Sequence, residues 1–448
     1  MPNAHLFMPE LPSKIRHYPQ IDEFLNEYSE QVSEEVMARK AVAMLLLQDI
    51  FPSRPSRARL LSSTDGGFRK MLFTLPHYAL RGPDNPVWAV FEDLLLKLPS
   101  QTAFLLVTHA STENQLKQWC DHKGLSQRAT IVVVPDHFKL SVWAEDAFVV
   151  AKDAETGEHF LVEPHSFYRR DDAMIAYFVA QATGLPFFKC PLYFEGGNIL
   201  VGDDFILLGA DYPVASLVHL ADFLVPEAGE TKADLVHRMY RQYFGKNRKL
   251  LYVGSKIRIP SGGRRKFTKD GETWKELYLQ NNEKGTVQPL FHLDMFLTLA
   301  GRGPDGKYCV LVGDSRLGAK MLGHKVSPYA MAEAFDDIAD TMQHLGFTVI
   351  RNPLPTVYLD DPKEKERMWY FASSNNALVE IRDEHDKTVY LPTYGHGAWK
   401  ELHKTDEANQ KIWEDLGFHV VLLGDFHPFA EHSGSLHCIV RYVERGSQ

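Results

Sequence analysis

Short apolar runs, separated by polar turns and amphipathic stretches, recur along this chain from about residue 80 onward. The run 103–107 predicts a short buried strand, whereas 113–120 has the spacing of a helix. The apolar run 130–134 predicts another strand, and the polar turn 143–146 leads into a further strand at 147–151. Strand, helix, strand and polar turn thus form one unit at the start of the main body.

The same unit repeats, in degenerate form, toward the C-terminus. Residues 246–269 are predicted to form a basic loop within the third unit. Five passes through one supersecondary unit indicate an internal repeat, and repeats packed in a ring would bring their polar turns to one axis. The later units have predicted helices at 172–183, 214–223, 329–345 and 407–416, and predicted strands at 160–162, 199–201, 206–208, 295–299, 308–312, 348–350, 377–379, 388–391 and 420–423.

The first 80 residues differ from this pattern. Residues 21–50 have helical periodicity, which Pro52 and Pro55 interrupt. We therefore expect residues 1–80 to be a mostly helical N-terminal extension that packs against one α/β domain formed by residues 81–448. The first residues lack a continuous apolar segment, so we expect no secretory signal.

Composition narrows the class of protein without fixing an activity. Of the 448 residues, 44% are hydrophobic and 24% charged, and no stretch has the apolar length of a membrane span. A formal net charge of -9 argues against a dedicated nucleic-acid binder, although the basic segment 246–269 leaves an RNA-binding loop as an alternative. The four cysteines form no CxxC pair and the histidines no HExxH motif. We therefore expect no protein-bound metal, no disulfide framework and a cytoplasmic location.

The C-terminal stretch 432–441 brings a cysteine to a turn. Ser433, Gly434 and Ser435 allow a tight backbone, and the apolar run that follows predicts a strand from Cys438 to Val443. A thiol held rigidly at the mouth of a strand suits a nucleophile. Taken alone, however, a single cysteine is more often a small buried core residue.

The polar turns of the other units supply groups that could act with this thiol. In His292-x-Asp294 on a strand, both side chains point to one face, and an ionisable pair among apolar neighbours is costly unless it is paired or functional. Taken alone, Asp146 could be a turn residue or a helix cap, and Glu195 could begin an ordinary turn. If the five turns converge, one cavity receives the side chains of Asp146, Glu195, His292, Asp294, Asn375 and Cys438.

As a set, these motifs resemble those of a known family. The resemblance is to the pentein superfamily of guanidino-group-modifying enzymes, nearest to agmatine deiminases and bacterial peptidylarginine deiminases. It spans about residues 100–443 and leaves the first 80 residues unexplained. The motifs that carry it, by their order and approximate spacing, are Trp143-x-x-Asp146, Glu195-Gly196-Gly197-Asn198, His292-x-Asp294-x-Phe296, the Asn375 turn and Leu436-His437-Cys438-Ile439.

The resemblance implies a five-bladed α/β propeller of ββαβ units with its site at the centre. It implies a cofactor-independent hydrolase, a deiminase, that converts the guanidino group of arginine, agmatine or an arginyl peptide to a ureido group with loss of ammonia. Cys438 would be the nucleophile that forms a covalent thiouronium intermediate, and His292 the general acid and base. Asp146 and Asp294 would bind the guanidinium nitrogens while Glu195 orients the imidazole. The other implied substrate-binding residues are Trp143, Asn198, Asn375, Arg169 and Arg170.

Two departures from the family pattern leave the substrate open. Glu145 stands where agmatine deiminases usually carry arginine, and the turn before the cysteine contains Ser433 and Ser435 instead of glycine throughout. Arg169 and Arg170 would favour a substrate with a carboxylate, and their absence from the cavity would favour an amine such as agmatine. An amidinotransferase, an arginine dihydrolase and a non-catalytic binding protein are alternatives on the same fold. We expect no nucleic-acid or membrane partner, and the sequence leaves a homo-oligomer open.

Overall fold

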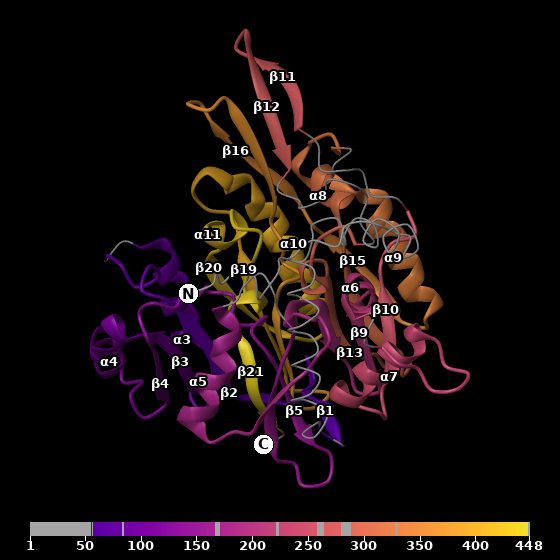
Figure 1. Ribbon diagram of the computed structural model, residues 1–448. Coiled ribbons are helices and arrows are strands. Elements are labelled where there is room, and N and C mark those ends of the chain that lie inside the picture. The colour runs from indigo at the N-terminus through magenta and orange to yellow at the C-terminus, as the bar shows by residue number, and fades with distance from the viewer. Residues whose placement is uncertain are drawn as a thin grey trace, which may run out of the picture.

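The computed structural model describes residue 55 and residues 57–82, 85–165, 171–220, 224–257, 264–278, 288–327 and 330–446. The helix expected at 21–50 lies outside the described residues. Within the described part, the chain is a mixed α/β protein whose strands form six small sheets. In Figure 1 most helices lie around the outside of these sheets.

Five of the sheets share one strand order. Each has an antiparallel pair, followed by a parallel strand that is reached through one or two helices. The ββαβ order expected from the sequence therefore occurs in all five. Their strands are β1 (Ala58–Leu60), β5 (Val149–Asp153), β6 (His159–Glu163) and β7 (Phe187–Lys189); β8 (Ile199–Val201), β9 (Phe205–Gly209) and β10 (Lys249–Val253); β13 (Leu297–Arg302), β14 (Tyr308–Asp314) and β15 (Thr348–Pro353); β18 (Leu378–Ile381), β19 (Lys387–Thr393) and β20 (His419–Asp425); and β21 (Arg441–Gly446), β2 (Gly67–Leu75), β3 (Ala103–His109) and β4 (Ala129–Val134).

Side-chain caps or left-handed glycines satisfy terminal backbone groups at several helix ends. The Asn85 side chain accepts a hydrogen bond from the backbone of the first helix, and Thr231 forms a capping box with Asp234. Gly184 and Gly323 end two helices in the left-handed conformation. None of the helices in the described ranges combines the length and apolarity needed to cross a membrane. The helices are α3 (Pro86–Lys97), α4 (Glu113–His122), α5 (Ile175–Thr183), α6 (Asp211–Leu220), α7 (Lys232–Phe244), α8 (Ser315–Leu322), α9 (Ala332–His344), α10 (His403–Asp415) and α11 (His427–Ala430).

Strands from the two ends of the described chain lie side by side. β2 pairs antiparallel with β21 and parallel with β3, and β1 pairs antiparallel with β5. The domain boundary expected at residue 80 is therefore wrong, because residues 58–60 and 67–75 are strands of the main body and not part of a helical extension. Arg69 and Lys70 interrupt the apolar pattern of β2, which hid this strand in the sequence.

A sixth sheet, with strand order β11-β12-β17-β16, projects from the body (Figure 1). It consists of β11 (Arg264–Lys269), β12 (Glu272–Tyr278), β16 (Thr356–Asp361) and β17 (Glu366–Phe371). The expectation of a basic loop at 246–269 is therefore wrong, since that segment contains β10 and β11.

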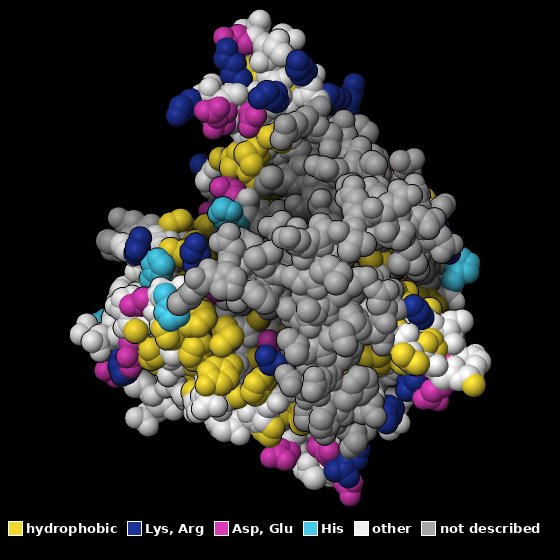
Figure 2. Space-filling view, viewed as in Figure 1, with side chains coloured by type: hydrophobic (Ala, Val, Ile, Leu, Met, Phe, Trp, Pro, Cys, Tyr) yellow, Lys and Arg dark blue, Asp and Glu magenta, His cyan; other side chains and the backbone are white. Residues whose placement is uncertain are grey.

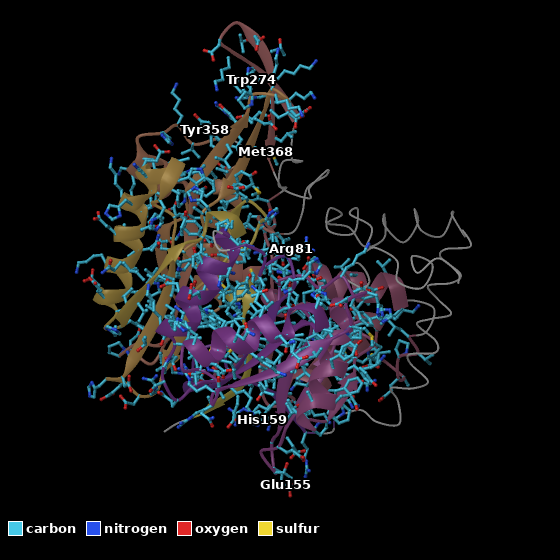
Figure 3. The ribbon with its side chains drawn as sticks, turned by 90° about the vertical axis from the view of Figure 1, so that its left-hand side faces the viewer. Arg81, Glu155, His159, Trp274, Tyr358 and Met368 are labelled. Atoms are coloured by element: carbon cyan, nitrogen blue, oxygen red, sulfur yellow. The ribbon has the colours of Figure 1, made fainter. Side chains whose placement is uncertain are left out.

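Several basic residues of the sixth sheet pair with acidic residues on other strands of the same sheet. Lys269 Nζ lies 2.6 Å from Asp360 Oδ2, and Arg367 Nε lies 2.7 Å from Oδ1 of the same aspartate. Figure 2 shows side chains of both charges on this projection. In the side view of Figure 3, Trp274 and Tyr358 lie in the projection, at the end of the molecule opposite Glu155. The sheet is therefore a network of offset charges and not a uniformly basic surface.

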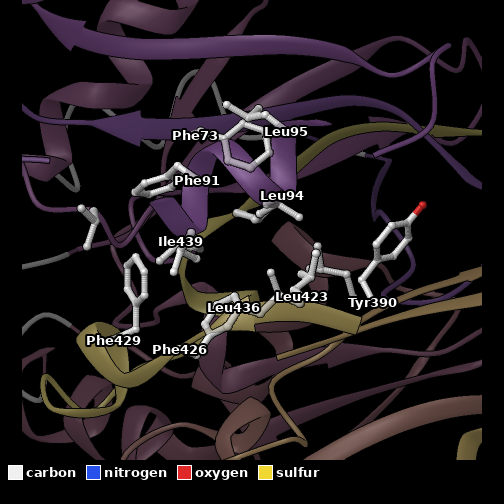
Figure 4. Packing of buried hydrophobic residues seen from close by; sticks show 14 of the residues in the cluster. Phe73, Phe91, Leu94, Leu95, Tyr390, Leu423, Phe426, Phe429, Leu436 and Ile439 are labelled. Carbon is white, nitrogen blue, oxygen red and sulfur yellow. The ribbon is translucent and has the colours of Figure 1, made fainter. Parts of the chain in front are cut away.

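One apolar cluster joins α3 to the C-terminal segment. Phe91 of α3 meets Phe73 and Phe429 edge-on, at ring-centroid distances of 6.4 and 5.8 Å. Leu436 and Ile439 belong to the same cluster and are fully buried (Figure 4). Because these two residues flank the turn that carries the cysteine, apolar packing fixes that turn against the sheet of β2.

Arg445 ties this C-terminal strand to the start of the described chain. It is 9% exposed, and its guanidinium lies over the rings of Tyr442 and Phe68, at 4.5 and 4.9 Å from their centroids. The guanidinium donates hydrogen bonds to five backbone carbonyls, those of Ser63, Thr64, Asp65, Gly66 and Val379.

Replacing Arg445 with methionine tests this tie. We expect Arg445→Met to lower the free energy of unfolding by about 3–5 kcal/mol, because buried carbonyl groups lose a charged donor. Arg238→Met is the control, since Arg238 is 47% exposed and pairs with Glu230 on the surface. It should cost less than about 1 kcal/mol. Chemical denaturation followed by circular dichroism measures both, and equal losses would contradict a special role for Arg445.

Candidate active site

In each of the five repeated sheets, a polar turn precedes one strand of the antiparallel pair that begins the repeat: β5, β8, β13, β18 or β21. The turns at 143–146 and 373–376 lead into β5 and β18. The other three are single 3-10 turns: η5 (Gly196–Asn198) before β8, η6 (Leu293–Met295) before β13 and η9 (His437–Ile439) before β21. The five turns thus occupy equivalent positions in the repeat.

Two expectations about these turns are wrong. Cys438 lies within η9 and not in a strand, since β21 begins only at Arg441. His292 and Asp294 lie immediately before and within η6, and not on a strand face. The backbone of η6 forms its own local hydrogen bond, from Phe296 N–H to Leu293 O at 3.0 Å, so it does not join a ladder.

The thiol of Cys438 lies in a buried polar environment. Its Sγ is 3.8 Å from Asp294 Oδ2 and 3.9 Å from Met295 Sδ, and the residue is 3% exposed. The Cys438 backbone N–H donates to Asn376 Oδ1 at 3.2 Å. Burial and the carboxylates of Asp294 and Asp146 raise the pKa of the thiol well above its ordinary value. In this state the sulfur is therefore a thiol and not a thiolate.

The imidazole of His292 is surrounded by carboxylates. Its Nε2 lies 2.6 Å from Glu195 Oε2, and its Nδ1 lies 3.7 Å from Asp146 Oδ1. Burial alone would lower the pKa of His292, but Asp146, Glu195 and Asp294 outweigh it and raise that pKa above its ordinary value. The surrounding carboxylates therefore favour the charged form of the ring.

Polar atoms without a hydrogen-bond partner mark the space between these groups. His292 Nδ1 and Asp294 Oδ1 are buried and have no partner among the described residues. A Cβ atom on Gly197 would lie 2.7 Å from His292 Nδ1 and 3.2 Å from Asp294 Oδ1, so a larger residue would enter the gap. Unsatisfied buried polar atoms are rare, and here they point to a ligand that donates or accepts hydrogen bonds.

A second group of charged residues lies next to Asp294. His437 Nδ1 lies 2.9 Å from Asp294 Oδ2, and Arg441 Nη1 lies 2.7 Å from Glu145 Oε1. Glu145 also donates its backbone N–H to Cys438 O at 3.2 Å. Burial raises the pKa of Glu145 to about 7 against the opposing charge of Arg441. Burial would lower the pKa of His437, but Glu145 and Asp294 raise it overall.

The sequence interpretation did not assign roles to His437, Glu145, Arg441 or Asn376. His437 was visible in the His-Cys motif, and Glu145 as a departure from the family pattern. Arg441 carried no signal of its own, because only the fold brings it to Glu145, which lies 296 residues earlier in the sequence.

Two of the predicted substrate-binding residues, Trp143 and Asn198, contact other parts of the protein. Trp143 packs edge-on against Phe429, at 5.9 Å between ring centroids, and lies over Gly434. Asn198 holds the turn of η6 through its Oδ1, which accepts from Leu293 N–H at 3.2 Å. Asn198 is fully buried and contacts the backbone of that turn, so it supports the His292 segment from below.

The amide of Asn375 points away from the thiol. Its Nδ2 donates to Asn352 Oδ1 at 3.0 Å, and its neighbour Asn376 is the residue that contacts Cys438. Arg169 and Arg170 lie outside the described residues.

Asp146, Glu195 and His292 are also the described residues that could hold a metal ion. Their ligand atoms lie within 4.8 Å of one another, and all three residues are buried. Two carboxylates and an imidazole suit a divalent cation, but they equally suit an organic cation with N–H donors. The cluster is therefore a cation site whose occupant its donor set alone does not fix.

The fold matches those of several solved deiminase structures. An agmatine deiminase from C. jejuni superposes with a TM-score of 0.54 at 13% identity, covering 87% of this chain and 97% of that chain. An agmatine deiminase from Enterococcus faecalis gives a TM-score of 0.54 at 15% identity, with 87% and 96% covered. A Porphyromonas gingivalis protein assigned provisionally as an arginine deiminase gives 0.55 at 14%, with 88% and 99% covered.

No protein-family model and no curated protein matches the sequence. The likeness to the solved structures therefore establishes a fold shared with the agmatine deiminases.

The raised pKa values of His292 and His437 give a testable pH dependence. In the folded protein both rings should titrate above 6.5, the ordinary value, because the surrounding carboxylates favour the charged form. The folded state then binds more protons than the unfolded state above pH 6.5. The stability from these rings is present below pH 6.5 and is lost as pH rises through the raised values.

Titration of isotopically labelled histidines by NMR measures both values, with His292→Asn and His437→Asn to assign the signals. The free energy of unfolding of each variant should vary less with pH above 6.5 than that of the original chain. Titration of both rings below 6.5 would contradict the prediction.

Proposed function

We propose that this chain is a cofactor-independent deiminase that hydrolyses the guanidino group of an arginine-like molecule to a ureido group and ammonia. One observation carries the proposal: the Cys438 thiol, the His292 imidazole and the carboxylates of Asp146, Glu195 and Asp294 meet in one buried cluster. The cluster contains a nucleophile, a proton carrier and the charges needed to hold a cation. The shared fold with agmatine deiminases supports the same reaction class.

A guanidinium group suits this cluster by shape and charge. It is planar and permanently cationic, and its N–H groups form a fork that matches carboxylate oxygens. Asp294 Oδ1 accepts no hydrogen bond from the described residues, and Asp146 Oδ1 lies 3.7 Å from His292 Nδ1. We assign these two aspartates to the guanidinium nitrogens, which would place the central carbon within reach of the sulfur.

Substrate binding would also activate the nucleophile. The carboxylates around Cys438 raise the pKa of the free thiol, and a bound cation between them reverses that effect. The thiolate would form when a guanidinium is present to be attacked. This arrangement protects the sulfur from other electrophiles while the site is empty.

The reaction would follow in two steps. The Cys438 thiol loses its proton to water as the cation binds, and the sulfur then forms a bond to the central carbon. The C–N bond to one terminal nitrogen breaks as His292 gives that nitrogen a proton, so that ammonia leaves. Water then attacks the thiouronium with His292 as base, and the C–S bond breaks to release the ureido product and the thiol. Because Glu195 holds Nε2 of the ring, Nδ1 is the nitrogen that we assign to proton transfer.

Glu145, Arg441 and His437 are proposed as positioning residues. His437 holds Asp294 Oδ2, the same oxygen that lies 3.8 Å from the sulfur. Arg441 donates to the carboxylate and the backbone carbonyl of Glu145, and the Glu145 backbone N–H donates to Cys438 O. Their task would be to keep one carboxylate charged and fixed beside the thiol.

We also infer that the five repeated sheets are the blades of a five-bladed propeller. The inference is supported by their common ββαβ order and by the position of a polar turn at the entrance of each. A cytoplasmic location is supported by the four free, buried cysteines.

Substitution of the cysteine tests the covalent step. Cys438→Ala and Cys438→Ser should both abolish ureido production, by at least about four orders of magnitude for loss of a nucleophile. The variants should retain the fold and the binding of a guanidinium compound. Cys309→Ala is the matched control, since Cys309 is a buried thiol in another sheet, and it should retain activity.

A colorimetric ureido assay gives the rates, and mass spectrometry of the quenched original enzyme should detect the thiouronium adduct on Cys438. Near-normal turnover in either Cys438 variant would exclude the covalent mechanism. Loss of activity on dialysis against a chelator would instead favour a metal ion on Asp146, Glu195 and His292.

A substrate panel tests the reaction class. Free arginine, agmatine and an arginyl peptide are incubated separately with the enzyme, and ureido product, ammonia and any transferred amidino group are quantified. We expect one ureido group and one ammonia per substrate consumed. Two ammonia molecules would indicate a dihydrolase, transfer to an added amine would indicate an amidinotransferase, and binding without turnover would indicate a binding protein.

A further inference from the structure

An unpaired hydrogen-bond donor lies beside the cysteine of the candidate active site. Asn376 is fully buried, and its Oδ1 accepts a hydrogen bond from the Cys438 backbone N–H at 3.2 Å. This hydrogen bond fixes which way the amide is turned, because a backbone N–H requires the oxygen and not the nitrogen. The Nδ2 group of the same amide is buried and has no hydrogen-bond partner among the described residues. Since buried donors are rarely left unpaired, we expect Nδ2 to gain an acceptor when the site works.

A guanidinium substrate cannot be this acceptor. All of its N–H groups are donors, and it has no acceptor atom to offer an amide. The acceptor must therefore come from the protein, and the Cys438 sulfur becomes one when the thiol ionises. A thiol is only a weak acceptor, whereas a thiolate carries a full negative charge. The amide of Asn376 already binds the backbone of that same cysteine.

A second donor reaches the sulfur from the turn that precedes it. The Ser435 N–H makes no backbone hydrogen bond within the described ranges, and Ser435 Oγ lies 2.5 Å from the hydroxyl oxygen of Tyr394. Burial and two nearby aspartates raise the pKa of Cys438, whereas the Ser435 backbone and the Asn376 side chain act in the opposite direction. They do so because a hydrogen bond donated to the sulfur favours its charged form.

We propose that the Asn376 amide, together with the Ser435 N–H, holds the sulfur of Cys438 as a thiolate at the two stages of the reaction in which it carries charge. The first stage is before attack, when the thiol has lost its proton. The second is after the C–S bond breaks, when the sulfur leaves with the electron pair of that bond. The place of Asn376 in turnover rests on the proposed function, but its effect on the thiol is a property of the substrate-free protein. Asn375 has no such role, since its amide is bound to Asn352.

Alkylation of Cys438 by iodoacetamide, without substrate, measures this effect. The sulfur displaces iodide as a thiolate, so the rate at one fixed alkaline pH follows the ionised fraction. Mass spectrometry of the peptide that contains Cys438 separates it from the other cysteines. Asn376→Leu removes both the acceptor and the donor of the amide, whereas Asn376→Asp keeps an acceptor for the Cys438 N–H and removes the donor.

Both variants should be alkylated about threefold to tenfold more slowly than the original chain. Loss of a hydrogen bond to a charged group lowers the ionised fraction about tenfold or more, and the greater nucleophilicity of a more basic thiolate offsets part of that loss. Ser374→Ala is the matched control, because it alters another buried side chain of the same turn, and it should be alkylated at the original rate.

Each alternative gives a different pattern. If Asn376 only anchors the backbone of Cys438, Asn376→Leu alone will react more slowly. If the added charge alone matters, only Asn376→Asp will do so. Either pattern, or unchanged rates in both variants, would overturn the proposal. Circular dichroism checks the fold, and Asn376→Ala, which is also uncharged, replaces Asn376→Leu if that variant does not fold.

Turnover separates failure of this inference from failure of the proposed function. In both Asn376 variants kcat should fall about tenfold, whereas the Kd of the guanidino substrate should be unchanged, because the amide donor does not bind a guanidinium. Weaker substrate binding with an unchanged kcat would overturn the proposal. If the original chain makes no ureido product, the proposed function fails, and the alkylation rates still decide whether Asn376 stabilises the thiolate.

Discussion

The constraint on which this structure depends is the mutual compensation of buried charge where the polar turns meet. Asp146, Glu195 and Asp294 are each less than a tenth exposed, and carboxylates this close together repel one another. The rings of His292 and His437, whose pKa values the carboxylates raise, lie within hydrogen-bonding distance of Glu195 and Asp294, and the sulfur of Cys438 lies against Asp294. Every element that carries one of these residues is therefore fixed relative to the others.

The repeated sheets bring these residues together by placing one polar turn at the same position in each repeat. A short turn before one strand of each sheet places its side chains at a strand end, where they project from the sheet edge and not from its faces. Five such turns then provide different chemistry from the same backbone position: carboxylates before β5 and β8, an imidazole and a carboxylate before β13, amides before β18 and a thiol before β21. Function is divided among repeats, so no single unit contains a working site.

The mixed α/β fold, and the meeting of His292, Glu195 and Asp146 and of Asp294 and Cys438, could be predicted from the sequence, while the individual hydrogen bonds could not. Periodicity identified most strands and helices, and the wide separation of His292 and Cys438 did not hide them because each sits in a recurring polar turn. The strand at 67–75 was missed because charged residues break its pattern. Which of Asn375 and Asn376 contacts the cysteine depends on the backbone of the turn, because the amides of adjacent residues point in different directions. The pair of Glu145 and Arg441 depends on the tertiary fold alone.

The pairing of β21 with β2 has a consequence for how this molecule matures. The strand β2 (Gly67–Leu75) can pair with β21 only after residues 441–446 have been synthesised, and several hundred residues separate the two strands in the sequence. The sulfur sits directly ahead of that late strand, and the carboxylates it meets belong to parts synthesised earlier. The buried cluster is therefore complete only once β21 has docked, because Cys438 directly precedes that strand and Asp294 comes from an earlier part of the chain.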